Sequence, residues 1–277
     1  MLPSPYRTRL TLLSAFCLVA LALPPFALAY AVFGWEAAAW FLGGLALAGL
    51  VRRGGSVALP GTLPLSPLEA PGLFALIESL ARGAGLKRVP EVRIAPSGPT
   101  NAAATLRGNR PVLVITQTLL GRLDVRRLGA VLAHETAHLA NRDLVLFRLA
   151  STFQAATLTL GFVTIVLAVL SLAIDPATAL VWALVAAVSP VASRLCAALL
   201  SRTREFAADL GAARLTGDPL ALADALAILE YRPRTLWDWV VGRRWPMPAD
   251  PAGNAFRTHP ATPERIRRLD RLAGLAR

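Results

Sequence analysis

The stretch VRRLGAVLAHETAHLANRDLVL, residues 125–146, decides how the rest of the sequence is interpreted. It has helical periodicity and contains no proline, which predicts a helix. His134 and His138 are four residues apart, so both imidazoles would lie on the same face of that helix. Two such imidazoles can hold one Zn²⁺, and Glu135 is placed to take a proton from an attacking water.

The alternative for this pattern is a pair of histidines that form ordinary hydrogen bonds on an amphipathic helix. That alternative also has to place two histidines and a glutamate beside an apolar helix face, where unpaired polar groups cost free energy. The sequence therefore favours a zinc site, and such a site needs a third protein ligand.

Glu205 is the favoured third ligand, and His259 is the other candidate. Glu205 and Asp209 are four residues apart on one expected helix, so Glu205 could bind the metal while Asp209 accepts the N–H of a ligating histidine. In the alternative interpretation, Glu205 only pairs with Arg202 or Arg204.

His259 stands directly before the last expected helix, and Arg265 follows on that helix. Either side chain could stabilise a tetrahedral oxyanion, and Arg265 could instead anchor a substrate carboxylate. From spacing alone, a surface histidine at a helix start is the simpler interpretation of His259.

The composition indicates a chain that lies partly in a membrane. The 277 residues are 55% apolar and 17% charged, with a mean hydropathy of +0.53, whereas soluble domains carry about 25% charged residues. Four stretches approach or exceed the span length of about 20 apolar residues: 10–29, 37–51 (if 33–35 join it), 153–174 and 176–200. We expect four transmembrane helices in two hairpins. The alternative for the first is a signal peptide cleaved after Ala29.

The charges predict an orientation. The net charge is +12, from 29 basic and 17 acidic residues. The turns within the two hairpins carry Glu36 and Asp175 but no Lys or Arg, so the basic residues fall on one side. The positive-inside rule then places both termini, residues 52–152 and residues 201–277 in the cytosol, in a multi-pass protein of the cell (inner) membrane. This orientation explains the basic excess, and no motif supports nucleic-acid binding.

Outside the hairpins, roughly 175 residues remain, enough for one domain with its own core. Residues 54–71 are a Gly/Pro-rich linker. Periodicity predicts helices over 72–84, 201–215, 219–231 and from 262, and strands over 91–95, 101–105 and 112–116. The expected organisation is a hairpin (1–53), a first domain part with the His-Glu-x-x-His helix (54–148), a second hairpin (149–200) and a second domain part (201–277). The fold class is a mainly α membrane protein with a cytosolic α+β domain and a small edge sheet.

Taken together, His134-Glu-x-x-His138, Asn141-Arg-Asp143, Glu205-x-x-x-Asp209 and His259-Pro-x-x-x-x-Arg265 resemble the HtpX-type membrane metallopeptidases. Their wider family includes the CAAX prenyl protease, and the resemblance covers the whole chain. It implies a zincin-like (gluzincin) peptidase domain that binds one Zn²⁺ per chain through His134, His138 and Glu205, with Glu135 as catalytic base. It also implies supporting roles around the ligands for Asp209, Asn141 and Asp143, and places near the oxyanion or substrate for His259 and Arg265.

The same resemblance extends to a possible substrate-binding strand. Asn101, Ala102, Ala103 and Ala104 are similar to the family's Asn-Ala-Phe-Ala edge-strand motif, with Ala103 where the family usually has Phe. In the family this strand pairs with the substrate main chain. Residues 232–248, rich in Trp and Arg, are typical of a membrane interface or of an ordinary packed loop.

The expected function is that of an integral-membrane zinc metalloendopeptidase, acting on membrane or misfolded proteins at the cytosolic face in protein quality control. One alternative is an intramembrane-cleaving zinc protease, but Arg126, Arg127, Arg142 and Asp143 make the motif helix too polar for a span. The other is a non-catalytic or latent scaffold or chaperone with a structural zinc, and the complete set of chemical residues weighs against it.

Overall fold

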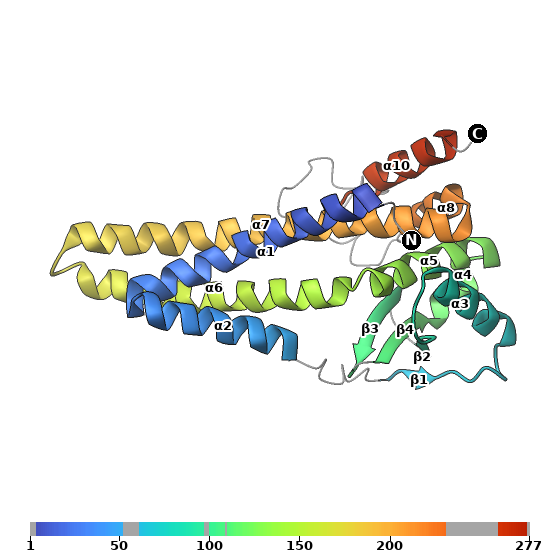
Figure 1. Cartoon of the computed structure of the whole chain (residues 1–277), viewed down its shortest axis with the longest axis horizontal. Coiled ribbons are helices and arrows are strands. Elements are labelled where there is room, and N and C mark those ends of the chain that lie inside the picture. Colours follow the sequence, from blue (N-terminus) through green and yellow to red (C-terminus); the bar gives the residue numbers. More distant parts are fainter. Residues whose placement is uncertain (1–3, 52–60, 97–99, 109, 231–259, 276–277) are drawn as a thin grey trace, which may run out of the picture.

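The computed structural model describes residues 4–51, 61–96, 100–108, 110–230 and 260–275. Long helices lie side by side and form one end of the molecule. A small sheet with shorter helices around it forms the other end (Figure 1). The four long or apolar helices at the first end are α1 Ser4–Phe33, α2 Trp35–Val51, α6 Asp143–Ser171 and α7 Pro176–Thr216.

Within the described residues, three helices are long and apolar enough to cross a membrane: α6, α7 and the part Thr8–Tyr30 of α1. Large apolar side chains point outward from the long helices; Phe162, for example, is 69% exposed. Such a surface is stable only in contact with lipid. The chain is therefore a multi-pass membrane protein.

The expectation of four spans in two hairpins is met only in part. Helix α2 has 17 residues, about 25 Å at 1.5 Å per residue, which is shorter than a hydrocarbon core of about 30 Å. Gly34, at φ +84°, separates α2 from α1. Helix α2 packs against α1 and α6, and α1 packs against both α6 and α7 (Figure 1).

The helix expected over residues 125–146 is shorter than predicted. Helix α5, Val125–Ala140, starts at Asp124, whose carboxylate accepts the backbone N–H of Arg127. It ends at Ala140 because Arg142 takes a left-handed conformation with φ +57°, and α6 starts at Asp143. This break turns Asp143 back toward the histidines. The periodicity of the sequence does not predict the break.

Helix α7 continues where a span followed by a separate helix was expected. It runs from Pro176 to Thr216, with Asp175 capping its start and Gly217, at φ +67°, ending it. The expected boundaries at 148 and 200 therefore fall inside the continuous helices α6 and α7, and the proposed division into four parts stays a prediction.

In the described part of the chain the sheet has four strands in the order β1-β2-β4-β3. Strands β2 and β4 are parallel, and β3 pairs antiparallel with β4 and forms one edge. Strand β1, with two residues, lies in the expected linker and is too short to give a sequence signal. The strands are β1 Leu63–Pro64, β2 Glu91–Ala95, β3 Ala102–Arg107 and β4 Arg110–Thr116.

Helix α5 lies at the centre of the domain core. Its Leu132 is fully buried among Ile77 of α3, Ile115 of β4, Leu222 of α8 and Leu269 of α10. Burying each of these side chains contributes about 1.5–3 kcal/mol, so the core holds the metal-binding motif in place. The shorter helices are α3 Pro71–Gly83, α4 Gln117–Arg122, α8 Pro219–Glu230 and α10 Thr262–Leu275.

Helices α5 and α7 approach closely at Gly211. A Cβ at Gly211 would lie 2.7 Å from the Cβ of Ala137, which stands between the two histidines on α5. We expect Gly211→Ala to lower the melting temperature, because overpacking of about 1–3 kcal/mol exceeds the helix-propensity gain of about 1 kcal/mol. Thermal unfolding of the purified protein in detergent measures this.

Gly129→Ala, on α5, is the matched control. A Cβ there would make an ordinary contact of 3.7 Å with Leu76, so the melting temperature should stay the same or rise. If the Gly211→Ala protein were as stable as the Gly129→Ala protein, α5 and α7 would not pack as closely at Gly211 as the structure indicates.

Candidate metal centre

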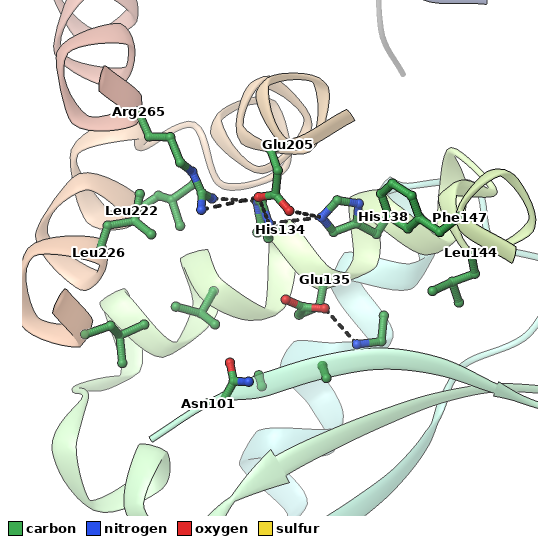
Figure 2. A pocket seen from close by; sticks show the side chains of 15 residues that line it. Asn101, His134, Glu135, His138, Leu144, Phe147, Glu205, Leu222, Leu226 and Arg265 are labelled. Atoms are coloured by element: carbon green, nitrogen blue, oxygen red, sulfur yellow. Dashed lines mark hydrogen bonds and ion pairs between the residues drawn. The ribbon is translucent and has the colours of Figure 1, made fainter. Parts of the chain in front are cut away.

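Three side chains with metal-binding atoms converge between α5 and α7. His134 and His138 come from α5 and Glu205 from α7, and all three are buried (Figure 2). The Nε2 atoms of the two histidines are 3.1 Å apart. The Glu205 oxygens lie 3.5 Å from His134 Nε2 and 3.8 Å from His138 Nε2. The expected spacing along each helix therefore becomes one compact group.

Each histidine has a carboxylate at its other ring nitrogen. Asp209 Oδ1 lies 3.0 Å from His134 Nδ1, and Asp143 Oδ2 lies 2.7 Å from His138 Nδ1. Nδ1–H is therefore the favoured tautomer of each neutral ring. The Nε2 lone pairs of both rings then point toward each other and toward Glu205. Three lone-pair donors this close repel one another unless a proton or a metal cation lies between them.

The donor set fits zinc. Tetrahedral ligands at 2.0–2.1 Å from one ion are about 3.3 Å from each other, close to the observed separations of 3.1–3.8 Å. Two imidazoles and one carboxylate leave the fourth position of a tetrahedral ion for water or substrate, as in catalytic zinc sites.

The charged side chains around the centre also favour the binding of a divalent cation. Glu135, Asp143, Glu205 and Asp209 carry four formal negative charges, and Arg204 and Arg265 carry two positive ones, which leaves a net charge of −2. Burial disfavours the charged form of His134, but its hydrogen bonds to Asp209 and Glu205 outweigh burial and raise its pKa to about 9. The surrounding carboxylates thus favour positive charge at this position.

Arg265, on α10, reaches the metal-binding group from outside. Its Nε and Nη2 donate to the two oxygens of Asp209 at 2.9 and 2.6 Å. Its Nη1 lies 3.3 Å from Glu205 Oε2. Burial alone would raise the pKa of the Asp209 carboxyl, but His134 and Arg265 hold it below its usual value. The structure therefore places Arg265 against the carboxylates, where it fixes Asp209 toward His134.

Arg204 is a part of the site that the sequence did not reveal. It pairs with the fully buried Asp143, donates to the backbone carbonyl of Asn141 at 3.0 Å and lies 3.5 Å from Ser14 Oγ of α1. The sequence suggests Arg204 only as a partner for Glu205. Its actual partners lie 61 and 63 residues earlier in the chain, and they meet it only because of the break at Arg142.

Glu135 faces a cleft of about 470 Å³, which both histidines, Glu205 and Arg265 also line. Its Oε2 accepts the backbone N–H of Ala104 in β3 at 2.7 Å (Figure 2). The expected strand residues Asn101, Ala102, Ala103 and Ala104 line this cleft. Apolar side chains also line it: Val131, Leu144, Phe147, Leu222, Leu226 and Leu229.

His259 and the Trp/Arg-rich segment 232–248 lie outside the described residues. The other expected site residues all lie at the centre or along its cleft, with Asn141 contributing its backbone carbonyl to Arg204.

Arg204→Met should weaken zinc binding by about 10–100-fold, because it removes the cation that orients Asp143 against His138. Leaving Asp143 buried without its partner should also cost stability on the order of 3–5 kcal/mol. Competition with a chromogenic chelator measures the zinc affinity of the purified protein.

The exposed Arg82 on α3 provides the control, and Arg82→Met should bind zinc as the unmodified protein does. Equal zinc affinity in the Arg204→Met and Arg82→Met proteins would contradict the positioning role of Arg204.

Comparison with known proteins agrees with this geometry. The family model described as "Peptidase family M48" matches residues 67–273. The protease HtpX homolog of Thermococcus kodakarensis is 37% identical, over 74% of this chain and 74% of the relative. That of Kineococcus radiotolerans is 33% identical, over 97% of this chain and 93% of the relative. The resemblance to HtpX-type metallopeptidases is thereby confirmed.

A solved structure supports the fold. The crystal structure of S. mikatae Ste24p matches with a TM-score of 0.56 and 21% sequence identity over 90% of this chain, which spans 62% of that protein's length. The family match, the HtpX relatives, the converging donor set and the apolar helices agree, and the chain belongs to peptidase family M48, as a membrane metallopeptidase.

Proposed function

We propose that this protein is a zinc-dependent endopeptidase that cleaves extended segments of membrane or misfolded proteins next to the bilayer. The observation that carries the proposal is the convergence of His134, His138 and Glu205, with Glu135 directly beside them and facing the cleft. These three ligands would hold one zinc ion, which when bound polarises the scissile carbonyl and acidifies the attacking water.

Glu135 is the general base in this proposal. Its carboxylate would take a proton from the attacking water and pass it to the nitrogen of the leaving amine. Helix α5 fixes Glu135 next to His134, and the N–H of Ala104 holds one of its oxygens at the wall of the cleft. Asp143 and Asp209 keep the two imidazoles in one tautomer, so both Nε2 atoms stay available as ligands.

Strand β3 is suited to bind an extended peptide. It is an edge strand, and the N–H of Ala104 points away from β4, toward Glu135. Because peptide groups alternate in direction along a strand, the N–H of Ala102 should face the same open edge. A substrate strand could therefore add to β3 through main-chain hydrogen bonds, which depend little on the residue at Ala103.

The apolar wall of the cleft favours substrates with a large apolar side chain near the cleaved bond. Leu222, Leu226 and Leu229 of α8 face the cleft together with Phe147 of α6. Burying one large apolar side chain there would contribute about 1.5–3 kcal/mol to binding. Segments with such side chains are exposed in misfolded proteins and at the ends of membrane spans, which fits a role in quality control.

The metal ligands lie on α5 and on the charged end of α7 beyond Leu200, outside the apolar stretches 153–174 and 176–200, which argues against cleavage within the membrane. Arg126 at the start of α5 binds Asp218 and Asp224, at 2.6 and 2.7 Å, on the surface of the domain. A scaffold with a structural metal is also less consistent with the site, because a structural role gives no reason for Glu135 to stand unligated in an open cleft. We further infer that the domain and both termini face the cytosol at the inner membrane, as the arginine distribution indicates.

Glu135→Gln should keep zinc at about one ion per chain and lose cleavage of an unfolded substrate by at least about 100-fold, since the amide cannot accept the proton. Zinc content and proteolysis are measured on the same preparation. Glu78→Gln, an exposed change on α3, is the control and should cleave normally. Cleavage by the Glu135→Gln protein at the unmodified rate would exclude the mechanism.

The orientation is tested in inside-out membrane vesicles. Added proteinase K, which does not require Lys or Arg, should cut within residues 54–148, while the turn at residues 172–175 between α6 and α7 should be protected, since it would face the vesicle lumen. Mass spectrometry of the released peptides identifies the cuts. Protection of residues 54–148 in sealed vesicles would mean that the domain faces the opposite compartment.

A further inference from the structure

A second cleft, of about 300 Å³, lies between α6 and α7 in the membrane part of the molecule. Polar side chains from both helices line it: Gln154 and Thr157 from α6, and Ser193 and Arg194 from α7. None of the described residues that line it is acidic. The cleft is therefore a positively charged, donor-rich hollow on an otherwise apolar pair of helices.

Several donors in this cleft have no partner within the described protein. Ser193 is 2% exposed, and its Oγ is a buried polar atom without a hydrogen bond. Among the described residues, neither Arg194 nor Gln154 has an ion pair or hydrogen bond, whereas Thr157 Oγ1 donates to the carbonyl of Phe153. Buried hydroxyl groups are nearly always hydrogen-bonded in proteins, so the cleft is built for a ligand that supplies acceptors.

The depth of the cleft matches one edge of the hydrocarbon core. Eighteen helical steps separate Pro176 from Arg194 on α7, about 27 Å, and seventeen separate Ser171 from Gln154 on α6, about 25 Å. Both helices turn at residues 172–175 on the far side of the membrane (Figure 1). With a hydrocarbon core of about 30 Å, the cleft lies at the headgroup level of the leaflet next to the peptidase domain.

We propose that this cleft binds the phosphate group of an anionic phospholipid from that leaflet. Phosphate oxygens only accept hydrogen bonds and carry negative charge, and Arg194 offers up to five N–H donors to them. Gln154 and Ser193 add neutral donors on two sides. A neutral peptide or a cation would not compensate the positive charge of Arg194.

The surroundings favour a lipid over a free phosphate ion. Leu158 lines the same cleft and is 62% exposed, and Val191, which follows the cleft-lining Pro190 on α7, is also exposed. An amphiphile can place its phosphate on the donors and an acyl chain along these apolar side chains. A free ion would use only the polar half of the cleft.

The test uses the full-length protein in nanodiscs that contain phosphatidylglycerol and phosphatidylcholine, with retained lipids counted by native mass spectrometry. The unmodified protein should retain one phosphatidylglycerol per chain in preference to phosphatidylcholine. Arg194→Gln should lower that preference about tenfold and Ser193→Ala about threefold, in line with loss of a charged and a neutral hydrogen bond. Arg194→Lys should keep most of the preference.

Arg9→Gln is the matched control, because Arg9 is an exposed arginine of α1 on the same side of the membrane and does not line the cleft. It should leave the lipid preference unchanged. An Arg194→Gln protein that folds, as judged by its melting temperature, and still prefers phosphatidylglycerol would overturn the proposal. So would an equal loss in the Arg9→Gln protein, or displacement of the lipid by inorganic phosphate at millimolar concentration, which would identify a free-ion site.

Discussion

The central constraint of this structure is the meeting of three lone-pair donors in a buried space. His134, His138 and Glu205 bring their ligand atoms within 4.8 Å of one another, and carboxylates at both Nδ1 atoms prevent the rings from turning their N–H groups inward. Such an arrangement is unfavourable without a cation and strongly favourable with one. A divalent cation would compensate the net charge of −2 in the surrounding group. Much of the domain consists of elements that keep these three ligand atoms close together although they repel one another.

Two similar relays provide that support, one behind each histidine. Asp209 and Arg265 stand behind His134, and Asp143 and Arg204 stand behind His138. Each relay joins elements far apart in sequence, so the two histidines are fixed by α7 and α10 as well as by their own helix. The second relay also reaches Ser14 of α1, which connects the membrane part of the molecule to the metal centre. The peptidase domain and the membrane-spanning helices therefore form the site jointly.

The chemistry of the site was largely predictable, because it depends on local periodicity. His134, Glu135 and His138 share one turn of a helix, and Glu205 and Asp209 are related in the same way, so spacing along the chain determined their relative places. The break at Arg142 and the role of Arg204 were not predictable, since both depend on contacts between distant segments. The continuity of α7 was hidden by its change from apolar to charged residues near Leu200, which signals the membrane surface and not a helix end. Strand β1 is defined by its pairing with β2, which no local pattern in the sequence indicates.

The unbroken helix α7 has a mechanical consequence. Eleven residues, about 17 Å, separate Arg194 at the edge of the hydrocarbon core from Glu205 at the metal. A rigid tilt of about 10° pivoting at Arg194 would move Glu205 by roughly 3 Å, far more than the few tenths of an ångström that a metal–ligand bond tolerates. Transmembrane helices adjust their tilt to the thickness of the bilayer around them. A change in bilayer thickness that tilted α7 would therefore displace one of the metal ligands directly.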